Sequence, residues 1–228
     1  MPARTVRDVA TLLDHAVLKP NFTAADLAAQ AAMCVARGVG CLCVRPCDVA
    51  AAARHVAGSP VVVASVIGFP HGSHRSETKA LESRLAIADG ARELDMVLAI
   101  GALLSGDESR VRDDIAAVVA EARPHGALVK VIFETCYLTP AQIVTACRLS
   151  EEAGADFVKT STGFGTAGAT PEAVRLMLDT VGGRLGVKAS GGVRSWADAV
   201  MYLDMGCKRL GVGDAATILD GGTSTGAY

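Results

Sequence analysis

Three lysines stand where a lysine is unexpected. The chain has six lysines among 228 residues, and Lys130, Lys159 and Lys188 each lie inside an apolar stretch typical of a buried strand. Because burying an unpaired ammonium group is unfavourable, such a lysine either pairs with a carboxylate, here Asp95 or Glu134, or takes part in chemistry. Three of them on consecutive predicted strands favour chemistry.

The segment FVKTSTG around Lys159 indicates a nucleophilic amine. A lysine attacks a carbonyl group only when neutral, and at its usual pKa of about 10.4 only about one molecule in a few thousand is neutral near pH 7. A neighbouring cation or a dry pocket lowers that pKa. Lys188 could be the cation and Asp95 could accept a proton. The pattern predicts an imine-forming site, although the residues alone leave open which lysine is the nucleophile.

Glycine-rich turns after the last strands indicate a phosphate site. Gly191, Gly192 and Arg194 follow one strand, and Gly211 and Gly213 follow the next. Backbone amides in such loops often bind phosphate, although the glycines could simply make tight turns.

Gly163 begins the string GFGTAG, which also fits a dinucleotide-binding motif. That motif requires an acid about 20 residues later, near where this chain has Lys188, so we predict no nicotinamide cofactor. Gly163 is assigned instead to the phosphate site.

Eight short apolar stretches predict strands, and they begin at Leu13, Cys41, Val61, Glu93, Leu128, Asp156, Leu185 and Arg209. Most are continuous apolar runs, as expected of parallel strands covered on both faces. Helices are predicted between them. The pattern predicts a single-domain (β/α)8 barrel over residues 1–228 with a short tail from about 220; an open doubly wound sheet is the alternative.

The predicted helices have clear start signals, which are Thr23 with Asp26, Thr139-Pro140, Thr170-Pro171 and Ser195 with Asp198. Gly38, Gly90, Gly154 and Gly206 are predicted to end helices. Leu27, Ala31 and Val35 recur at helical spacing in one predicted helix, and Leu81, Leu85 and Ala88 precede Gly90 in another.

Composition and charge exclude several classes of protein. The net charge of −2 gives no basic excess for nucleic acid or an anionic membrane, and no stretch reaches the length of a membrane span. The amino terminus lacks a signal-peptide pattern, so a cytoplasmic protein is expected. Cys41, Cys43 and Cys47, or His71 and His74, could bind a metal. The cysteines lack a fourth ligand at zinc-like spacing and the histidines lack clustered carboxylates, so no metal is predicted.

The motifs together identify a family. LDHAVL, CLCVRP, VIGFPHG, ELDMV, LVKVIFET, AGADFVKTSTGFG, ATPE and VKASGGVR occur in this order between about Asp14 and Gly211. In sequence and spacing they resemble those of the 2-deoxyribose-5-phosphate aldolases, a family of Schiff-base aldolases. FVKTSTG together with VKASGG is the most specific pair.

The resemblance implies roles for particular residues. Lys159 would form the Schiff base, Lys188 would perturb its pKa and move protons, Asp95 would relay protons, and the carboxyl-terminal Tyr228 could assist. Cys43 and Lys130 are assigned to the substrate site with the glycines and Arg194. No cofactor is implied.

The implied reaction is the reversible cleavage of 2-deoxy-D-ribose 5-phosphate to acetaldehyde and D-glyceraldehyde 3-phosphate by a homodimer or homotetramer. The chain departs from the family at RLGVGDAA, where Gly213 and Asp214 replace serines that help to hold the phosphate. A class I aldolase with a different or unphosphorylated acceptor, or a catalytically silent sugar-phosphate-binding barrel, is the alternative.

Overall fold

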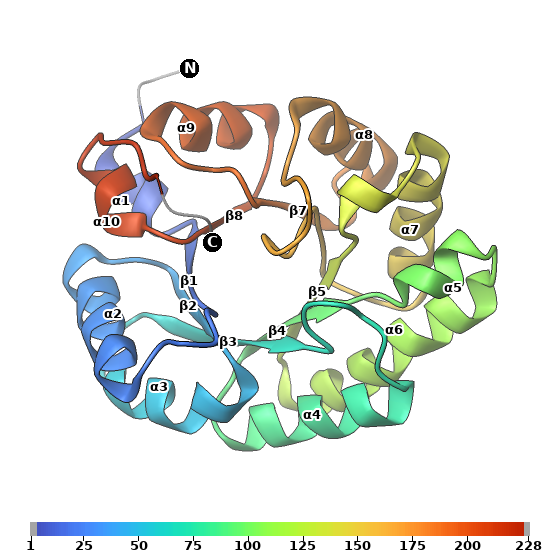
Figure 1. Cartoon of the computed structure of the whole chain (residues 1–228), viewed down its shortest axis with the longest axis horizontal. Helices are drawn as coiled ribbons and strands as arrows, with labels where there is room; N and C mark the ends of the chain where they lie inside the picture. The colour runs from blue at the N-terminus through green and yellow to red at the C-terminus, as the bar shows by residue number, and fades with distance from the viewer. Residues whose placement is uncertain (1–3, 226–228) are drawn as a thin grey trace.

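The protein is a closed parallel barrel, seen in a computed structural model that describes residues 4–225 (Figure 1). Each strand pairs with the next in the sequence, and β1 pairs with β8 to close the barrel. The strands are β1 Leu13–Val17, β2 Cys41–Val44, β3 Val62–Ile67, β4 Glu93–Val97, β5 Leu128–Ile132, β6 Phe157–Lys159, β7 Gly186–Ser190 and β8 Arg209–Val212. This confirms the predicted (β/α)8 barrel.

Helices form a ring around the barrel (Figure 1). The α-helices are α1 Val6–Ala10, α2 Ala24–Arg37, α3 Val49–His55, α4 Ser76–Ala88, α5 Ile100–Leu104, α6 Glu108–Ala122, α7 Pro140–Glu152, α8 Pro171–Val181, α9 Trp196–Met205 and α10 Ala215–Leu219. Short 3₁₀ turns, Pro46–Asp48, Arg123–His125 and Thr135–Tyr137, connect some of them. Among the described residues, no helix has both the length and the apolar character needed to cross a membrane.

Local capping chemistry sets the helix ends, as the sequence predicts. The side chains of Thr23, Thr139 and Ser195 accept hydrogen bonds from the backbone of the third helical residue, and each forms a reciprocal capping box. Gly38 and Gly206 adopt left-handed conformations at the carboxyl ends of α2 and α9, which glycine reaches without steric cost.

The apolar residues noted at helical spacing do not all lie on the buried faces of α2 and α4. In α2 the buried face continues from Ala31 to Cys34, and Val35 is exposed. In α4 Leu81 and Leu85 are 45% and 57% exposed, and the buried side carries Lys79. The Lys79 ammonium donates to Asp114 Oδ2 in α6 at 2.6 Å and to the Val97 carbonyl oxygen at 2.8 Å. This buried ion pair, rather than apolar periodicity, sets the orientation of α4.

The barrel interior has an apolar half and a charged half. Apolar side chains from β1–β3 and the turns that follow them pack together, and they are Ala16, Leu18, Cys41, Cys43, Ala64 and Val66. The opposite half receives ionisable side chains from β4–β8, together with Asp14 of β1. The larger apolar core lies between the strands and the helices. Because alternate strand residues point inward, each ionisable side chain has a fixed height in the barrel.

Strand β6 is shorter than its prediction, which extended from Asp156 to Ser161. It ends at Lys159, and the hydroxyl of Thr160 bonds with the backbone of the neighbouring strand end. Thr160 Oγ1 donates to the Ser190 carbonyl oxygen and accepts from the Ser190 amide, both at 3.0 Å. These two hydrogen bonds fix the chain at Thr160, the residue that follows the predicted nucleophile.

Candidate active site

Lys159, Lys188 and Asp95 meet in the barrel interior. Lys159 in β6 is in register with Lys188 in β7, and Asp95 comes from β4 across the lumen. Both lysine ammonium nitrogens lie 2.7 Å from Asp95 Oδ2, and all three side chains are buried. The structure therefore brings together the three residues that the sequence predicts to be catalytic.

Lys130 lies on the other side of Asp95. Its ammonium nitrogen is 2.7 Å from Asp95 Oδ1 and 2.5 Å from Glu93 Oε2. The sequence suggested Asp95 or Glu134 as the partner of a buried lysine, and Lys130 contacts Asp95 rather than Glu134. Burial opposes its charge, but Asp95 and then Asp14 outweigh this and raise the pKa of Lys130. Lys130 is thus held as a cation between carboxylates, and a direct substrate contact stays a prediction.

Sequence reasoning missed three further members of this network. Asp14 in β1 accepts a hydrogen bond from Lys188 and one from Arg209 Nε at 2.7 Å. Arg209 in β8 also bonds both oxygens of Glu93 in β4, at 2.9 and 3.1 Å. Glu93 precedes Asp95 by two residues, so the alternation of a strand could have identified it as an inward-facing group.

The network contains one more cation than anion when every group is ionised. Its carboxylates are Asp14, Glu93 and Asp95, and its cationic side chains are Lys130, Lys159, Lys188 and Arg209. An uncompensated charge is costly in a buried site. Loss of a proton from one lysine balances the set at three and three.

Lys159 pairs with one carboxylate of the network, Asp95, whereas Lys188 pairs with two and Lys130 with three. Burial lowers the pKa of Lys159, Asp95 opposes this, and the neighbouring Lys188 charge lowers the pKa further. The pKa of Lys130 moves in the opposite direction, and that of Asp95 is held well below its usual value because its three lysine neighbours outweigh its burial. The surroundings of Lys159 therefore shift its pKa towards the neutral amine, whereas those of Lys130 hold that lysine as a cation.

Cys43 lies in the same interior, beside Lys159. Burial raises the pKa of its thiol to about 11, and Asp95 adds to the increase. Cys41 lies deeper, near Asp14 and Glu93, and these three are the one group of potential metal ligands among residues 4–225. Both carboxylates of the group are already paired with lysine or arginine, and burial keeps Cys41 a neutral thiol. A metal ion there would have to displace those cations.

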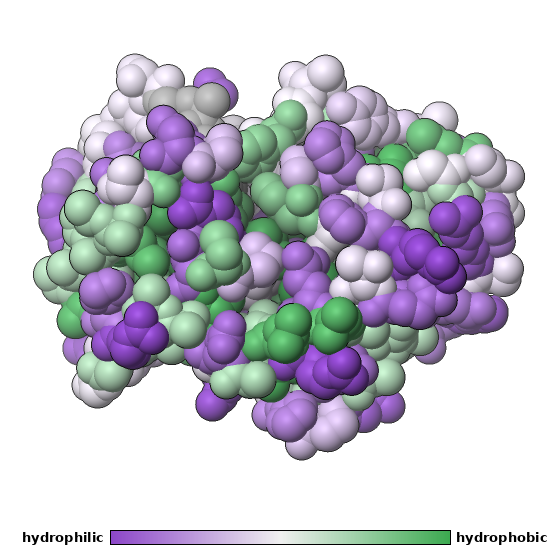
Figure 2. Space-filling view, turned by 60° about the horizontal axis from the view of Figure 1, so that its bottom comes forward, coloured by the Kyte–Doolittle hydropathy of each residue, from purple (hydrophilic) through white to green (hydrophobic). Residues whose placement is uncertain are grey.

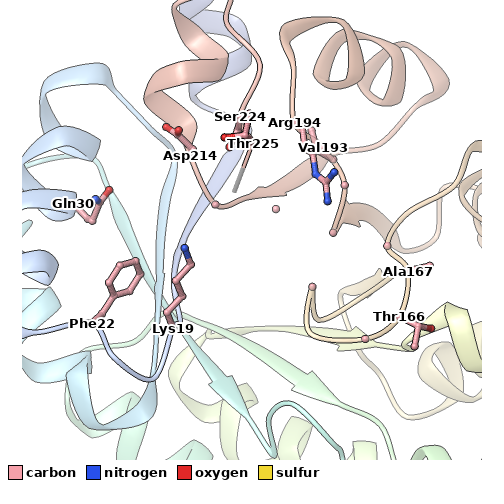
Figure 3. Close-up of a pocket in the computed structure, with 17 residues that line it drawn as sticks. Lys19, Phe22, Gln30, Thr166, Ala167, Val193, Arg194, Asp214, Ser224 and Thr225 are labelled. Atoms are coloured by element: carbon pink, nitrogen blue, oxygen red, sulfur yellow. The ribbon is translucent and has the colours of Figure 1, made fainter. Parts of the chain in front are cut away.

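A cavity of about 500 Å³ opens at the carboxyl ends of the strands (Figure 3). All six residues that the sequence assigns to phosphate binding line it, and they are Gly163, Gly191, Gly192, Arg194, Gly211 and Gly213. The loop after β6 packs closely on the turn after β7, because a Cβ on Gly168 would lie 1.6 Å from the Gly191 carbonyl oxygen. Lys159 and Lys188 lie within the strands that lead to these loops.

Asp214 also lines this cavity, but its carboxylate is engaged elsewhere. It caps α10 by accepting from the Thr217 amide at 3.1 Å and the Thr217 hydroxyl at 2.7 Å. In Figure 3 the side chain turns away from the open centre of the cavity. The negative charge remains near the cavity wall, and the carboxylate oxygens are occupied by the helix cap.

Glu134 holds the loop that follows the predicted nucleophile. It has a left-handed backbone (φ 56°), and its oxygens accept from the amide and the hydroxyl of Thr162. Thr162 Oγ1 in turn accepts from the Phe164 amide at 3.0 Å. Burial raises the pKa of Glu134. A left-handed non-glycine residue next to a site signals a constrained position, and no sequence pattern indicates it here.

The remaining candidates lie apart from the lysines. His71 lines a second hollow of about 340 Å³ with Glu134 and Phe164, and His74 lines a different one. GFGTAG forms the loop between β6 and α8 that borders the main cavity, and the next helix begins only at Pro171. Tyr228 lies outside the described residues.

Comparison with known proteins agrees with this geometry. The model of the DeoC/LacD family aldolases matches residues 9–211. A deoxyribose-phosphate aldolase from Mycolicibacterium paratuberculosis is 51% identical over 222 residues, covering 95% of this chain and 98% of the relative. Another from Thermococcus gammatolerans is 48% identical over 216 residues, covering 94% and 96%.

Solved structures give the same result. A putative deoxyribose-phosphate aldolase from Coccidioides immitis superposes with a TM-score of 0.93 at 38% identity, covering 96% of this chain and 87% of that one. A tetrameric deoxyribose phosphate aldolase from Aeropyrum pernix superposes with a TM-score of 0.89 at 32% identity, covering 95% and 91%.

Proposed function

Because this chain belongs to the DeoC/LacD family of aldolases, we propose that it cleaves 2-deoxy-D-ribose 5-phosphate reversibly to acetaldehyde and D-glyceraldehyde 3-phosphate. The relatives named above have this activity in their names. The main structural support is the buried network of three carboxylates and four cations, in which the surroundings of Lys159 shift its pKa towards the neutral amine. Such an amine is the group that a Schiff-base aldolase requires.

The first step is formation of an imine. The neutral Lys159 amine adds to the aldehyde carbon C1 of the open-chain sugar, and the resulting carbinolamine loses water to give an iminium ion. Lys188 lies beside the new bond, because Lys188 and Lys159 both contact Asp95. Its ammonium can donate the proton that the departing hydroxyl requires, and Asp95 stabilises the positive charge left on the iminium nitrogen.

The iminium then acts as the electron sink for carbon–carbon cleavage. Loss of the proton from the C3 hydroxyl turns C3 into a carbonyl group, and the electron pair of the C2–C3 bond moves to form an enamine on Lys159. Asp95 and the neutral form of Lys188 are the groups in place to accept this proton, directly or through water. Protonation of the enamine at C2 and hydrolysis release acetaldehyde and restore the amine.

The cavity at the strand ends would hold the other end of the sugar. Its lining is rich in glycine amides and includes Arg194, which suits a phosphate group. The negative charge of Asp214 on the same wall favours a second candidate, a class I aldolase whose acceptor is unphosphorylated. The intact lysine and aspartate network argues against a silent sugar-phosphate-binding barrel.

Two measurements test the proposal together. Purified protein is assayed for cleavage of deoxyribose 5-phosphate with unphosphorylated deoxyribose in parallel, and it is also treated with acetaldehyde and borohydride before peptide mass mapping. We expect faster cleavage of the phosphorylated sugar and a reduced two-carbon adduct on Lys159. An adduct on Lys130 or Lys188 would reject the assigned nucleophile, and equal rates on both sugars would favour the unphosphorylated acceptor.

We also propose that the protein forms a homodimer or homotetramer in the cytoplasm. Leu81 and Leu85 are neighbours on one exposed face of α4. Figure 2, in which the bottom of Figure 1 comes forward, shows apolar side chains among polar ones on this side of the molecule. Light scattering gives the oligomeric state, and a monomer at micromolar concentration would contradict this part of the proposal.

A further inference from the structure

The cavity above the catalytic lysines has a second cation that the phosphate assignment does not include. Lys19 follows β1 by two residues and lines the cavity on the β1 side. Arg194 lines it from the loop after β7. In Figure 3 both side chains border the same open space, with Lys19 on one wall and Arg194 on the other. An anion between them would meet positive charge from two directions.

The loop that carries Lys19 is held in place by a single arginine. Arg45 Nη1 donates to the carbonyl oxygens of Lys19 and Pro20, both at 3.1 Å, and Nη2 donates to that of Phe22 at 3.0 Å. Arg45 is itself oriented by Asp48, whose Oδ2 lies 2.5 Å from its Nε. These bonds fix the backbone of the loop, which lowers the entropy cost of placing the Lys19 ammonium at the cavity.

The aromatic ring of Phe22 restricts the side chain of Lys19 as well. The Lys19 ammonium nitrogen lies 5.7 Å from the centroid of the Phe22 ring, within the range of a cation–π contact. Phe22 also lines the cavity and donates its backbone amide to the Lys19 carbonyl oxygen at 3.2 Å. The ammonium is therefore presented at the cavity wall on a restrained loop.

Charge balance gives Lys19 a role. A phosphate monoester carries about −1.5 to −2 charges near pH 7, and Asp214 adds a negative charge to the same cavity wall. Arg194 alone leaves this total uncompensated. We propose that Lys19 is a second cationic contact for the substrate phosphate and determines the preference for phosphorylated substrates. This inference rests on the proposed function. Arg45 is a positioning residue that acts through the Lys19 loop.

The experiment compares Lys19→Met with Lys208→Met, which removes a lysine from an exposed site away from the cavity. The readout is the ratio of kcat/KM for deoxyribose 5-phosphate to kcat/KM for deoxyribose. Lys19→Met should lower this ratio roughly ten- to hundredfold, mainly through KM, since it removes a charge-assisted contact. Lys208→Met should leave it unchanged, and Lys19→Arg should recover most of the loss.

Inorganic phosphate provides a probe that does not depend on turnover. Its dissociation constant, measured by calorimetry, should increase in Lys19→Met and remain at the parent value in Lys208→Met. If Lys19→Met weakens phosphate binding as expected but the parent protein cleaves no deoxyribose 5-phosphate, the proposed function fails and the anion site stands. An unchanged ratio together with an unchanged phosphate constant in folded Lys19→Met overturns the inference.

The role of Arg45 has its own test. Arg45→Lys keeps the positive charge but cannot reproduce the fork that bonds three carbonyl oxygens and Asp48. We expect a higher KM for deoxyribose 5-phosphate with little change in kcat. The rate at which borohydride traps the imine formed with acetaldehyde should be normal. An equal loss with both sugars would show that Arg45 serves the stability of the barrel rather than the position of Lys19.

Discussion

Replacing Lys188 with methionine tests whether the positive charge of Lys188 lowers the pKa of Lys159. In the parent structure the ammonium nitrogens of Lys159 and Lys188 both lie 2.7 Å from Asp95 Oδ2. They are therefore at most about 5.4 Å apart, and two like charges at that separation repel by roughly 3 kcal/mol at an effective dielectric constant of about 20. The variant leaves three cations and three carboxylates, so Lys159 can stay protonated without leaving a charge uncompensated.

Loss of the Lys188 charge should slow imine formation near neutral pH. Removing a neighbouring positive charge raises the pKa of Lys159 and reduces its neutral fraction at any pH below that pKa. About 3 kcal/mol corresponds to roughly a hundredfold reduction. The rate should recover as the pH is increased, because the amine then loses its proton without help.

Borohydride trapping of acetaldehyde across a pH series is the appropriate assay, since it reports imine formation without carbon–carbon cleavage. A deficit that disappears at alkaline pH separates the effect on Lys159 from the loss of Lys188 as a proton carrier, which would lower kcat at every pH. Lys188→Arg, which keeps the charge, should retain trapping near neutral pH. Folded Lys188→Met with the parent rate and pH profile would refute the charge-balance argument.

Three further predictions concern stability, metal and phosphate. Lys79→Met leaves Asp114 buried without its cation, and the free energy of unfolding measured with urea should fall by about 3–5 kcal/mol; a loss no larger than that of an exposed lysine variant would contradict the role of this pair. Activity should survive EDTA, because the iminium supplies the electron sink; loss on chelation and recovery with zinc would reject the imine mechanism. Gly213 is not among the glycines with positive φ, so Gly213→Ser should be tolerated, and its hydroxyl should increase the preference for the phosphorylated sugar through a lower KM. If that preference stays the same in a folded variant, the loop after β8 does not determine it.

Several features could be predicted from the sequence because they depend on residues close together in the chain. The two residues of a capping box, such as Thr23 and Asp26, are three positions apart, and the strand alternation that sets which side chains face inward repeats every two residues. Lys159 and Lys188 were identifiable for this reason, since a lysine in an apolar strand is visible without knowing what lies opposite. The eight-stranded barrel followed from the alternation of such strands with capped helices.

Other features depended on closure of the barrel. Asp14 and Arg209 are 195 residues apart, and they meet only because β1 pairs with β8. The apolar residues of α4 do not mark its buried face, since the Lys79–Asp114 pair lies between two helices and leaves no trace in either helix alone.

The chemical state of the site was likewise decided by tertiary structure. The sequence by itself determined which residue types face the interior and at what height along each strand. The distances among Asp14, Glu93, Asp95 and the four cations were set by the barrel as a whole. Since the strength of an electrostatic interaction depends on separation and burial, the sequence could propose a reactive lysine, but only the fold shows which charges surround each lysine.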